Sequence, residues 1–157
     1  MFIAAEPFGM FAGLPLHPLL VHSAVVLVPL VAIGALVMSY LPSFSRRHGK
    51  LILILALVAQ GSVFLAKLSG EAFSEILNKE VEKHAQLGEI APFVTIPMVG
   101  LIYLRWRMDR AGSSTGSVAI RRLTSVALVI ASLASLVMIF LVGHSGASSV
   151  WGWIDKL

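Results

Sequence analysis

Long apolar runs separated by short polar segments account for most of the chain. Four of these runs are candidate membrane spans: residues 18–41, 50–68, 85–104 and 123–142. Each run is close to the roughly 20 apolar residues that a helix needs to cross a bilayer. The second run is short, but Lys50 and Lys67 at its ends can extend it by snorkelling. The pattern therefore predicts four transmembrane helices in a single membrane domain over residues 1–157.

The polar segments predict how these spans are connected. Residues 42–50 and 105–122 form two basic loops. Between the second and third spans, Ser69-Gly70-Glu71 is typical of a helix start with Ser69 as its N-cap. The apolar side chains that follow recur at three- and four-residue spacing: Phe73, Ile76, Leu77 and Val81. We expect an all-α, integral membrane four-helix bundle with a short amphipathic helix between spans two and three.

Composition agrees with a membrane protein and limits its chemistry. Hydrophobic residues make up 57% of the 157-residue chain and charged residues only 13%, with a mean hydropathy of +0.90. The chain contains no cysteine. This excludes disulfides, thiolate zinc sites, iron–sulfur ligation and covalently attached haem, so any metal must be held by nitrogen, oxygen or methionine sulfur.

The basic residues predict the orientation in the membrane. Residues 41–50 and 105–122 hold eight of the twelve Lys and Arg with one acid, whereas the opposite side holds four with seven acids. By the positive-inside rule, both termini face outward from a bacterial cytoplasmic membrane that the chain crosses several times. This asymmetry explains the net charge of +4 without a nucleic-acid partner, and we expect none.

Four of the five histidines fall on the predicted outer side. His17 and His22 begin span one, His84 begins span three and His144 ends span four, whereas His48 lies alone among the inner arginines. We expect the first helix to begin at Pro18, which places His17 just outside it. Any one of these imidazoles could simply cap a helix or bond at the interface. Their common side and depth, from three helices, favour a shared site.

The residues around these histidines carry a resemblance. The motifs are His17-Pro18-x-x-x-His22, Ser69-Gly70-Glu71, His84 with Gly88, and Gly143-His144-x-Gly146. In these the chain resembles a family of small, poorly characterised bacterial membrane proteins with four spans. Family members usually have Phe-Pro after the second histidine and a double glycine near the end; here Ser23-Ala24 and Gly146-Ala147 stand there. The resemblance implies a four-helix architecture and a redox or respiratory context, and no established reaction.

The first functional hypothesis is a redox protein with a b-type haem. Imidazoles that project inward from facing helices supply axial ligands without cysteine. Helices one and three are diagonal in an up-and-down bundle, and the wider diagonal gap suits a haem better than a bare ion, so His22 and His84 are the preferred pair. Glu80, one turn before His84, is expected to fix its tautomer. His17 and His144 would bind a haem propionate or a quinone oxygen.

Two alternatives remain open. Three or four of the imidazoles could share one zinc or copper ion. The protein could instead be a non-catalytic accessory subunit of a respiratory complex with no cofactor, in which the histidines only cap helices. Small residues at four-residue spacing in span four offer a face for such a hetero-oligomer: Ala127, Ala131 and Ser135. No residue is predicted to be catalytic.

Overall fold

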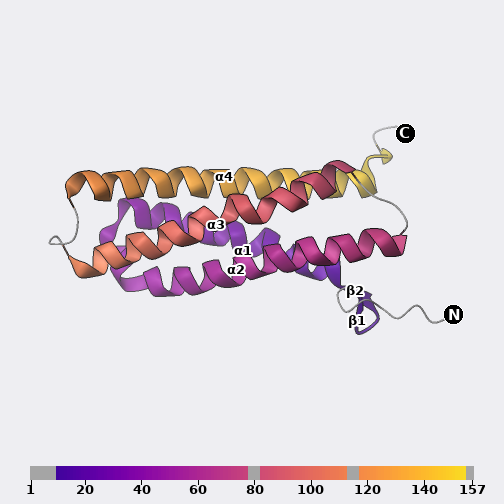
Figure 1. The fold of residues 1–157 in the computed structure, drawn as a ribbon, viewed down its shortest axis with the longest axis horizontal. Helices are drawn as coiled ribbons and strands as arrows, with labels where there is room; N and C mark the ends of the chain where they lie inside the picture. The colour runs from indigo at the N-terminus through magenta and orange to yellow at the C-terminus, as the bar shows by residue number, and fades with distance from the viewer. Residues whose placement is uncertain (1–9, 78–81, 113–116, 155–157) are drawn as a thin grey trace.

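Four long helices and one small hairpin make up the structure. The computed structural model describes residues 10–77, 82–112 and 117–154, without the side chains of 10, 11 and 73–77. The helices are α1 (Leu16–Tyr40), α2 (Pro42–Leu77), α3 (Glu82–Ala111) and α4 (Val118–Trp151), and the strands β1 (Met10–Phe11) and β2 (Leu14–Pro15) pair before α1 (Figure 1). All four helices are long and apolar enough to cross a membrane. The expected all-α membrane bundle is confirmed.

The helices run up and down in sequence, so each packs against its neighbours in the chain. Helices α1 and α4 also pack together and close the bundle, which leaves α1 and α3 diagonal to one another. The bundle therefore has two different ends (Figure 1). We call one the basic end; it carries the α1–α2 and α3–α4 connections. We call the other the histidine end; it carries the α2–α3 connection, the start of α1 and the end of α4.

The centre of the bundle combines alanines and serines with larger side chains such as Met38, Ile102 and Leu128, and other large side chains cover the surface. Buried positions include alanines from all four helices: Ala24, Ala32, Ala35, Ala56, Ala59, Ala91 and Ala131. Large aliphatic side chains such as Val26, Ile130 and Leu123 are exposed. Helices in lipid gain little from burying large apolar groups and associate instead through close backbone approach. The distribution is therefore that of a bundle surrounded by lipid.

Polar side chains in the middle of the bundle are satisfied between helices. Gln60 of α2 donates to the carbonyl oxygen of Pro92 at 3.0 Å and accepts from the Thr95 hydroxyl at 2.7 Å. Ser23 of α1 and Ser62 of α2 bond to each other at 2.9 Å. Because lipid offers no hydrogen bonds, such pairs hold neighbouring helices in register.

The helices extend beyond the apolar runs at both ends. Helix α1 begins at Leu16 rather than Pro18, so His17 lies in its first turn; Pro18 is tolerated there because the first four N–H groups have no intrahelical partner. Residues 42–50, expected as a loop, are the first turns of α2 with Pro42 as the first helical residue. Helix α4 continues through residues 143–146, where an end was expected.

The amphipathic helix expected between spans two and three is not a separate element. Helix α2 passes through Ser69 and Gly70 without interruption and continues to Leu77. Ser69 does not cap a new helix, because its hydroxyl donates to the carbonyl oxygen of Ala66 in the preceding turn. The side chains of 73–77 and the whole of Val81 lie outside the described residues.

The small-residue face of α4 points into the bundle. Ala131 is 8% exposed and Ser135 is fully buried, and Ala127 is half-buried. The face was expected to be open to a partner subunit, and that expectation is wrong for these side chains. Small residues instead allow α4 to approach the other helices of the same chain closely.

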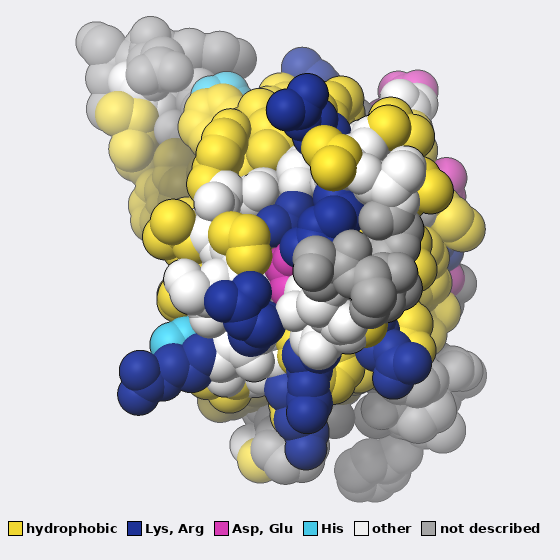
Figure 2. Space-filling view, turned by 90° about the vertical axis from the view of Figure 1, so that its left-hand side faces the viewer, with side chains coloured by type: hydrophobic (Ala, Val, Ile, Leu, Met, Phe, Trp, Pro, Cys, Tyr) yellow, Lys and Arg dark blue, Asp and Glu magenta, His cyan; other side chains and the backbone are white. Residues whose placement is uncertain are grey.

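Arginine and lysine side chains gather over the basic end (Figure 2). Two of them are held by one buried acid: Asp109 of α3 accepts from Arg105 Nε at 2.6 Å and from Arg121 of α4 at 2.8 Å. Arg105 also donates to the Ser125 hydroxyl of α4. This network ties α3 to α4 at the basic end and leaves the remaining cations there without an acid among the described residues.

Candidate functional site

His17 lies in the first turn of α1 and reaches across to α2. Its Nδ1 is 2.9 Å from the carbonyl oxygen of Ala66 and 3.2 Å from the Ser69 hydroxyl. A carbonyl oxygen can only accept, so Nδ1 carries the hydrogen. The ring is half-buried and packs against Gly70, where a side chain would begin 3.0 Å from ring carbon Cε1.

His84 makes the same set of contacts in the other half of the molecule. It lies in the first turn of α3 and its Nδ1 is 3.1 Å from both the carbonyl oxygen of Val142 and the Ser145 hydroxyl of α4. The ring packs against Gly146, where a Cβ atom would again be 3.0 Å from Cε1. In both halves the serine hydroxyl also donates to the carbonyl that the histidine uses.

The bundle thus consists of two hairpins, α1–α2 and α3–α4, with equivalent histidine sites. In each, the histidine at the start of the first helix docks on a Ser-Gly pair in the last turns of the second: Ser69-Gly70 for His17 and Ser145-Gly146 for His84. Glycine lets the ring lie this close, because a Cβ atom at either position would force the ring to move by a few tenths of an ångström.

The two equivalent rings meet at the histidine end. Their centroids are 6.1 Å apart and the ring planes make an angle of 77°, an edge-to-face arrangement. Because α1 and α3 are diagonal, this contact crosses the middle of the bundle. Since Nδ1 of each ring carries the hydrogen, the lone pair of each neutral ring lies on Nε2, which is the tautomer that metal-ligating histidines commonly adopt.

The other predicted site residues lie apart from this pair. His22 is exposed, and its Nδ1 donates to the carbonyl oxygen of Pro18 on its own helix at 2.5 Å. His144 is exposed, and the centroid of its ring lies 5.9 Å from that of Phe140, one turn earlier in α4. The structure therefore brings His17, rather than His22, beside His84. Glu80 lies outside the described residues.

His48 is at the basic end, as expected, but it is not simply a loop residue. It lies on α2, where the centroid of its ring is 4.7 Å from that of Phe44, and its Nδ1 is buried. No group of three or more histidine and acidic side chains suited to a metal ion occurs among residues 10–72, 82–112 and 117–154.

Sequence reasoning did not identify the residues on which the histidines dock. It treated Ser69 as a cap, and it treated the segment that contains Ser145 and Gly146 as a helix end. One signal was present: the Ser-Gly pair occurs near the end of both span two and span four, on the same predicted side as the histidines. The pairing itself depends on which helices are neighbours, and that is visible only in the structure.

Comparison with known proteins gives a family and no function. A family model described as a predicted membrane protein (DUF2231) matches residues 13–153. The match spans all four helices and confirms the resemblance to an uncharacterised membrane family. No curated protein and no solved structure matches the chain.

Proposed function

The chain belongs to this family of predicted membrane proteins, and we propose that it is a membrane-embedded redox protein with a b-type haem ligated by His17 and His84. The observation that carries the proposal is the meeting of two imidazoles from diagonal helices, each with Nδ1 committed to a backbone carbonyl. This revises the ligand pair expected from the sequence, in which His22 took the place of His17.

The number of ligands favours haem over a bare ion. Zinc sites in proteins generally use three or four protein ligands, and no such group occurs in the part of the chain that the structure describes. Haem iron takes four ligands from the porphyrin and needs only two from the protein. Two histidines from diagonal helices of the bundle supply that number.

The closeness of the two rings supports a shared group. The centroids of His17 and His84 are 6.1 Å apart, and both imidazoles lie at the same end of the bundle. When bound, haem would supply one-electron transfer. The protein would hold both imidazoles in the required tautomer through Ala66 and Val142, with Ser69 and Ser145 limiting rotation of the rings.

The redox partner belongs to the same proposal. A haem within a membrane bundle exchanges electrons with a membrane quinone or with a subunit of a respiratory complex, as the family resemblance implies. By the distribution of Lys and Arg, the histidine end faces outward. The exposed imidazoles of His22 and His144 near this end are available to bind a haem propionate or a quinone oxygen.

The absorption spectrum of the purified protein tests the proposal. We expect the wild type, isolated in mild detergent from cells supplied with haem precursor, to show reduced-state haem bands. His17→Ala and His84→Ala should abolish them, and added free imidazole should restore them in part. His48→Ala is the control, because it removes the histidine of the basic end, on α2 against Phe44, and it should keep the bands.

Other results would point elsewhere. Loss of the bands in His22→Ala with retention in His17→Ala would restore the pair expected from the sequence. Stoichiometric zinc or copper without haem would support an ion site in which two imidazoles are completed by other ligands. Wild-type protein with neither haem nor metal would contradict a cofactor role and leave the accessory-subunit hypothesis.

A further inference from the structure

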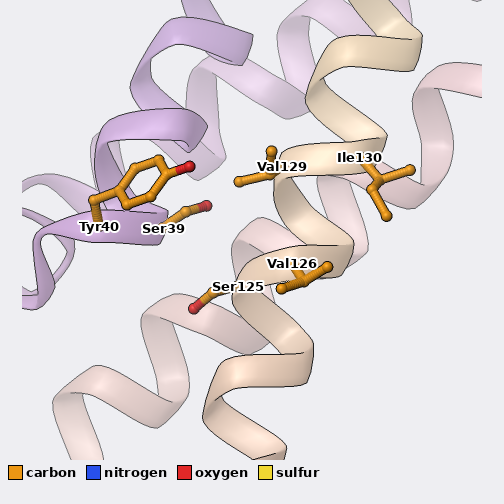
Figure 3. Close-up of a pocket in the computed structure, with 6 residues that line it drawn as sticks. All are labelled: Ser39, Tyr40, Ser125, Val126, Val129 and Ile130. Atoms are coloured by element: carbon orange, nitrogen blue, oxygen red, sulfur yellow. The ribbon is translucent and has the colours of Figure 1, made fainter.

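A groove lies on the surface between α1 and α4 near the basic end. It has a volume of about 160 Å³ and is lined by six residues: Ser39, Tyr40, Ser125, Val126, Val129 and Ile130. Figure 3 shows the side chains of Ser39 and Tyr40 on α1 directed toward α4. The groove opens sideways, since Tyr40 and Ile130 at its edges are 73% and 62% exposed. In a membrane this opening faces lipid, because both helices are candidate spans.

The groove has both an apolar and a polar lining. Val126, Val129 and Ile130 supply aliphatic side chains from α4, and Ser39, Tyr40 and Ser125 supply hydroxyls. Along α4, Ser125 precedes the aliphatic residues and so lies nearer the basic end. The Ser39 and Ser125 hydroxyls already donate to carbonyls of their own helices. They therefore make the entrance polar without requiring a partner of their own.

An exposed arginine lies on α4 between the groove and the basic end. Arg122 lies one helical turn before Val126 on α4, about 6 Å closer to the basic end and on the same side of the helix. It is exposed, and it makes no hydrogen bond or ion pair with any residue that the structure describes. Its neighbour Arg121 is already bonded to Asp109 and to two backbone carbonyls.

The charge around the groove is strongly positive. Residues 41–50 and 105–122 contain eight Lys and Arg and a single acid. That acid, Asp109, is fully used by Arg105 and Arg121. Six cations remain without a carboxylate from these segments, and basic sites between transmembrane helices attract anionic lipid head groups.

We propose that this groove binds an anionic phospholipid, with its phosphate on Arg122 and the upper part of one acyl chain against Val126, Val129 and Ile130. The order of chemistry along α4, from cation to hydroxyl to aliphatic side chain, follows the order from phosphate to ester to hydrocarbon in the lipid. The site is at the opposite end of the bundle from His17 and His84, so it is independent of the haem proposal.

Competition between two lipids with identical acyl chains tests this inference. Purified protein is mixed with equal amounts of phosphatidylglycerol and phosphatidylcholine, and bound lipid is counted by native mass spectrometry. We expect the wild type to prefer phosphatidylglycerol by about fivefold, and Arg122→Gln to bring this ratio close to one. Arg107→Gln is the matched control, since it removes an exposed arginine of the basic end from α3, outside the groove, and it should keep the preference.

A second variant tests the hydrocarbon part without altering charge. Val126→Trp is expected to fill the groove. It should lower the ratio of bound phosphatidylglycerol to phosphatidylcholine to the value found for Arg122→Gln. The inference is overturned if the wild type binds both lipids equally, or if Arg107→Gln loses the preference as completely as Arg122→Gln, because attraction would then be diffuse. Equal competition by glycerol 3-phosphate would also overturn it, since the site would then take a free phosphate.

Discussion

At Gly70 and Gly146 a single methyl group would crowd an imidazole ring. A Cβ atom at either position lies 3.0 Å from a ring carbon, of His17 at Gly70 and of His84 at Gly146. These contacts are tighter than ordinary van der Waals contacts, so each ring would have to move by a few tenths of an ångström and distort its bond to Ala66 or Val142. The two glycines are therefore positioning residues for the histidine pair.

We predict that Gly70→Ala and Gly146→Ala each destabilise the protein by about 1–3 kcal/mol through overpacking. Gly143→Ala is the control, because it lies in the same helix as Gly146 with nothing within 4 Å of its Cβ position; it should be neutral or stabilising by up to about 1 kcal/mol. Unfolding in detergent, followed by fluorescence of the three tryptophans, measures the difference. Equal effects of all three substitutions would show that ring contact is not the cause.

At the scale of helices, α3 and α4 are tied together at both ends. His84 and Ser145 join them at the histidine end. At the basic end, Asp109 of α3 pairs with Arg121 of α4, and Arg105 of α3 donates to Ser125 of α4. Asp109 is 1% exposed and Arg105 is 5% exposed. A buried charge that loses its partner is costly because neither water nor another charge replaces it.

We predict that Asp109→Ala destabilises the bundle by roughly 3–5 kcal/mol, since it leaves Arg105 buried without a counter-charge. Adding Arg105→Met should recover part of the loss. Lys67→Ala removes a more exposed ion pair, with Glu71, and should cost no more than about 1 kcal/mol. Chemical denaturation of the purified variants provides the comparison. An Asp109→Ala protein as stable as Lys67→Ala would contradict a structural role for the network.

For the molecule as a whole, orientation follows from the difference between its two ends. The basic end carries eight of the twelve Lys and Arg, so it is predicted to stay in the cytoplasm. The termini and the histidine pair are then outside. Under the proposed function, this orientation would decide from which side of the membrane a redox partner reaches His17 and His84.

Single cysteines test this orientation cleanly because the chain has none of its own. A cysteine at Ser148, near the end of α4, should react with a membrane-impermeant reagent in intact cells. One at Ser43, in the first turn of α2, should react only after the membrane is opened. Both positions are exposed. The reverse pattern of labelling would place the histidine pair on the cytoplasmic side.

The sequence by itself determined the number of helices, their order and the end of the bundle at which four histidines gather. Apolar run length is a local property, and a hydrophobic run of sufficient length becomes a membrane helix wherever it lies in the chain. The sidedness of Lys and Arg is likewise a count along the sequence. The helix ends were harder to predict, because Ser69 and Gly143 continue a helix where local preference favours a break.

Only the tertiary structure decided which histidines meet. His17 and His22 are five residues apart on one helix and therefore point in different directions, and no local pattern favours the first. The choice depends on the rotation of α1 about its axis, which the packing of its buried face sets and which brings His17 onto Ser69 and Gly70 of α2. Such contacts join residues far apart in the chain, so no local pattern reveals them until the helices are packed.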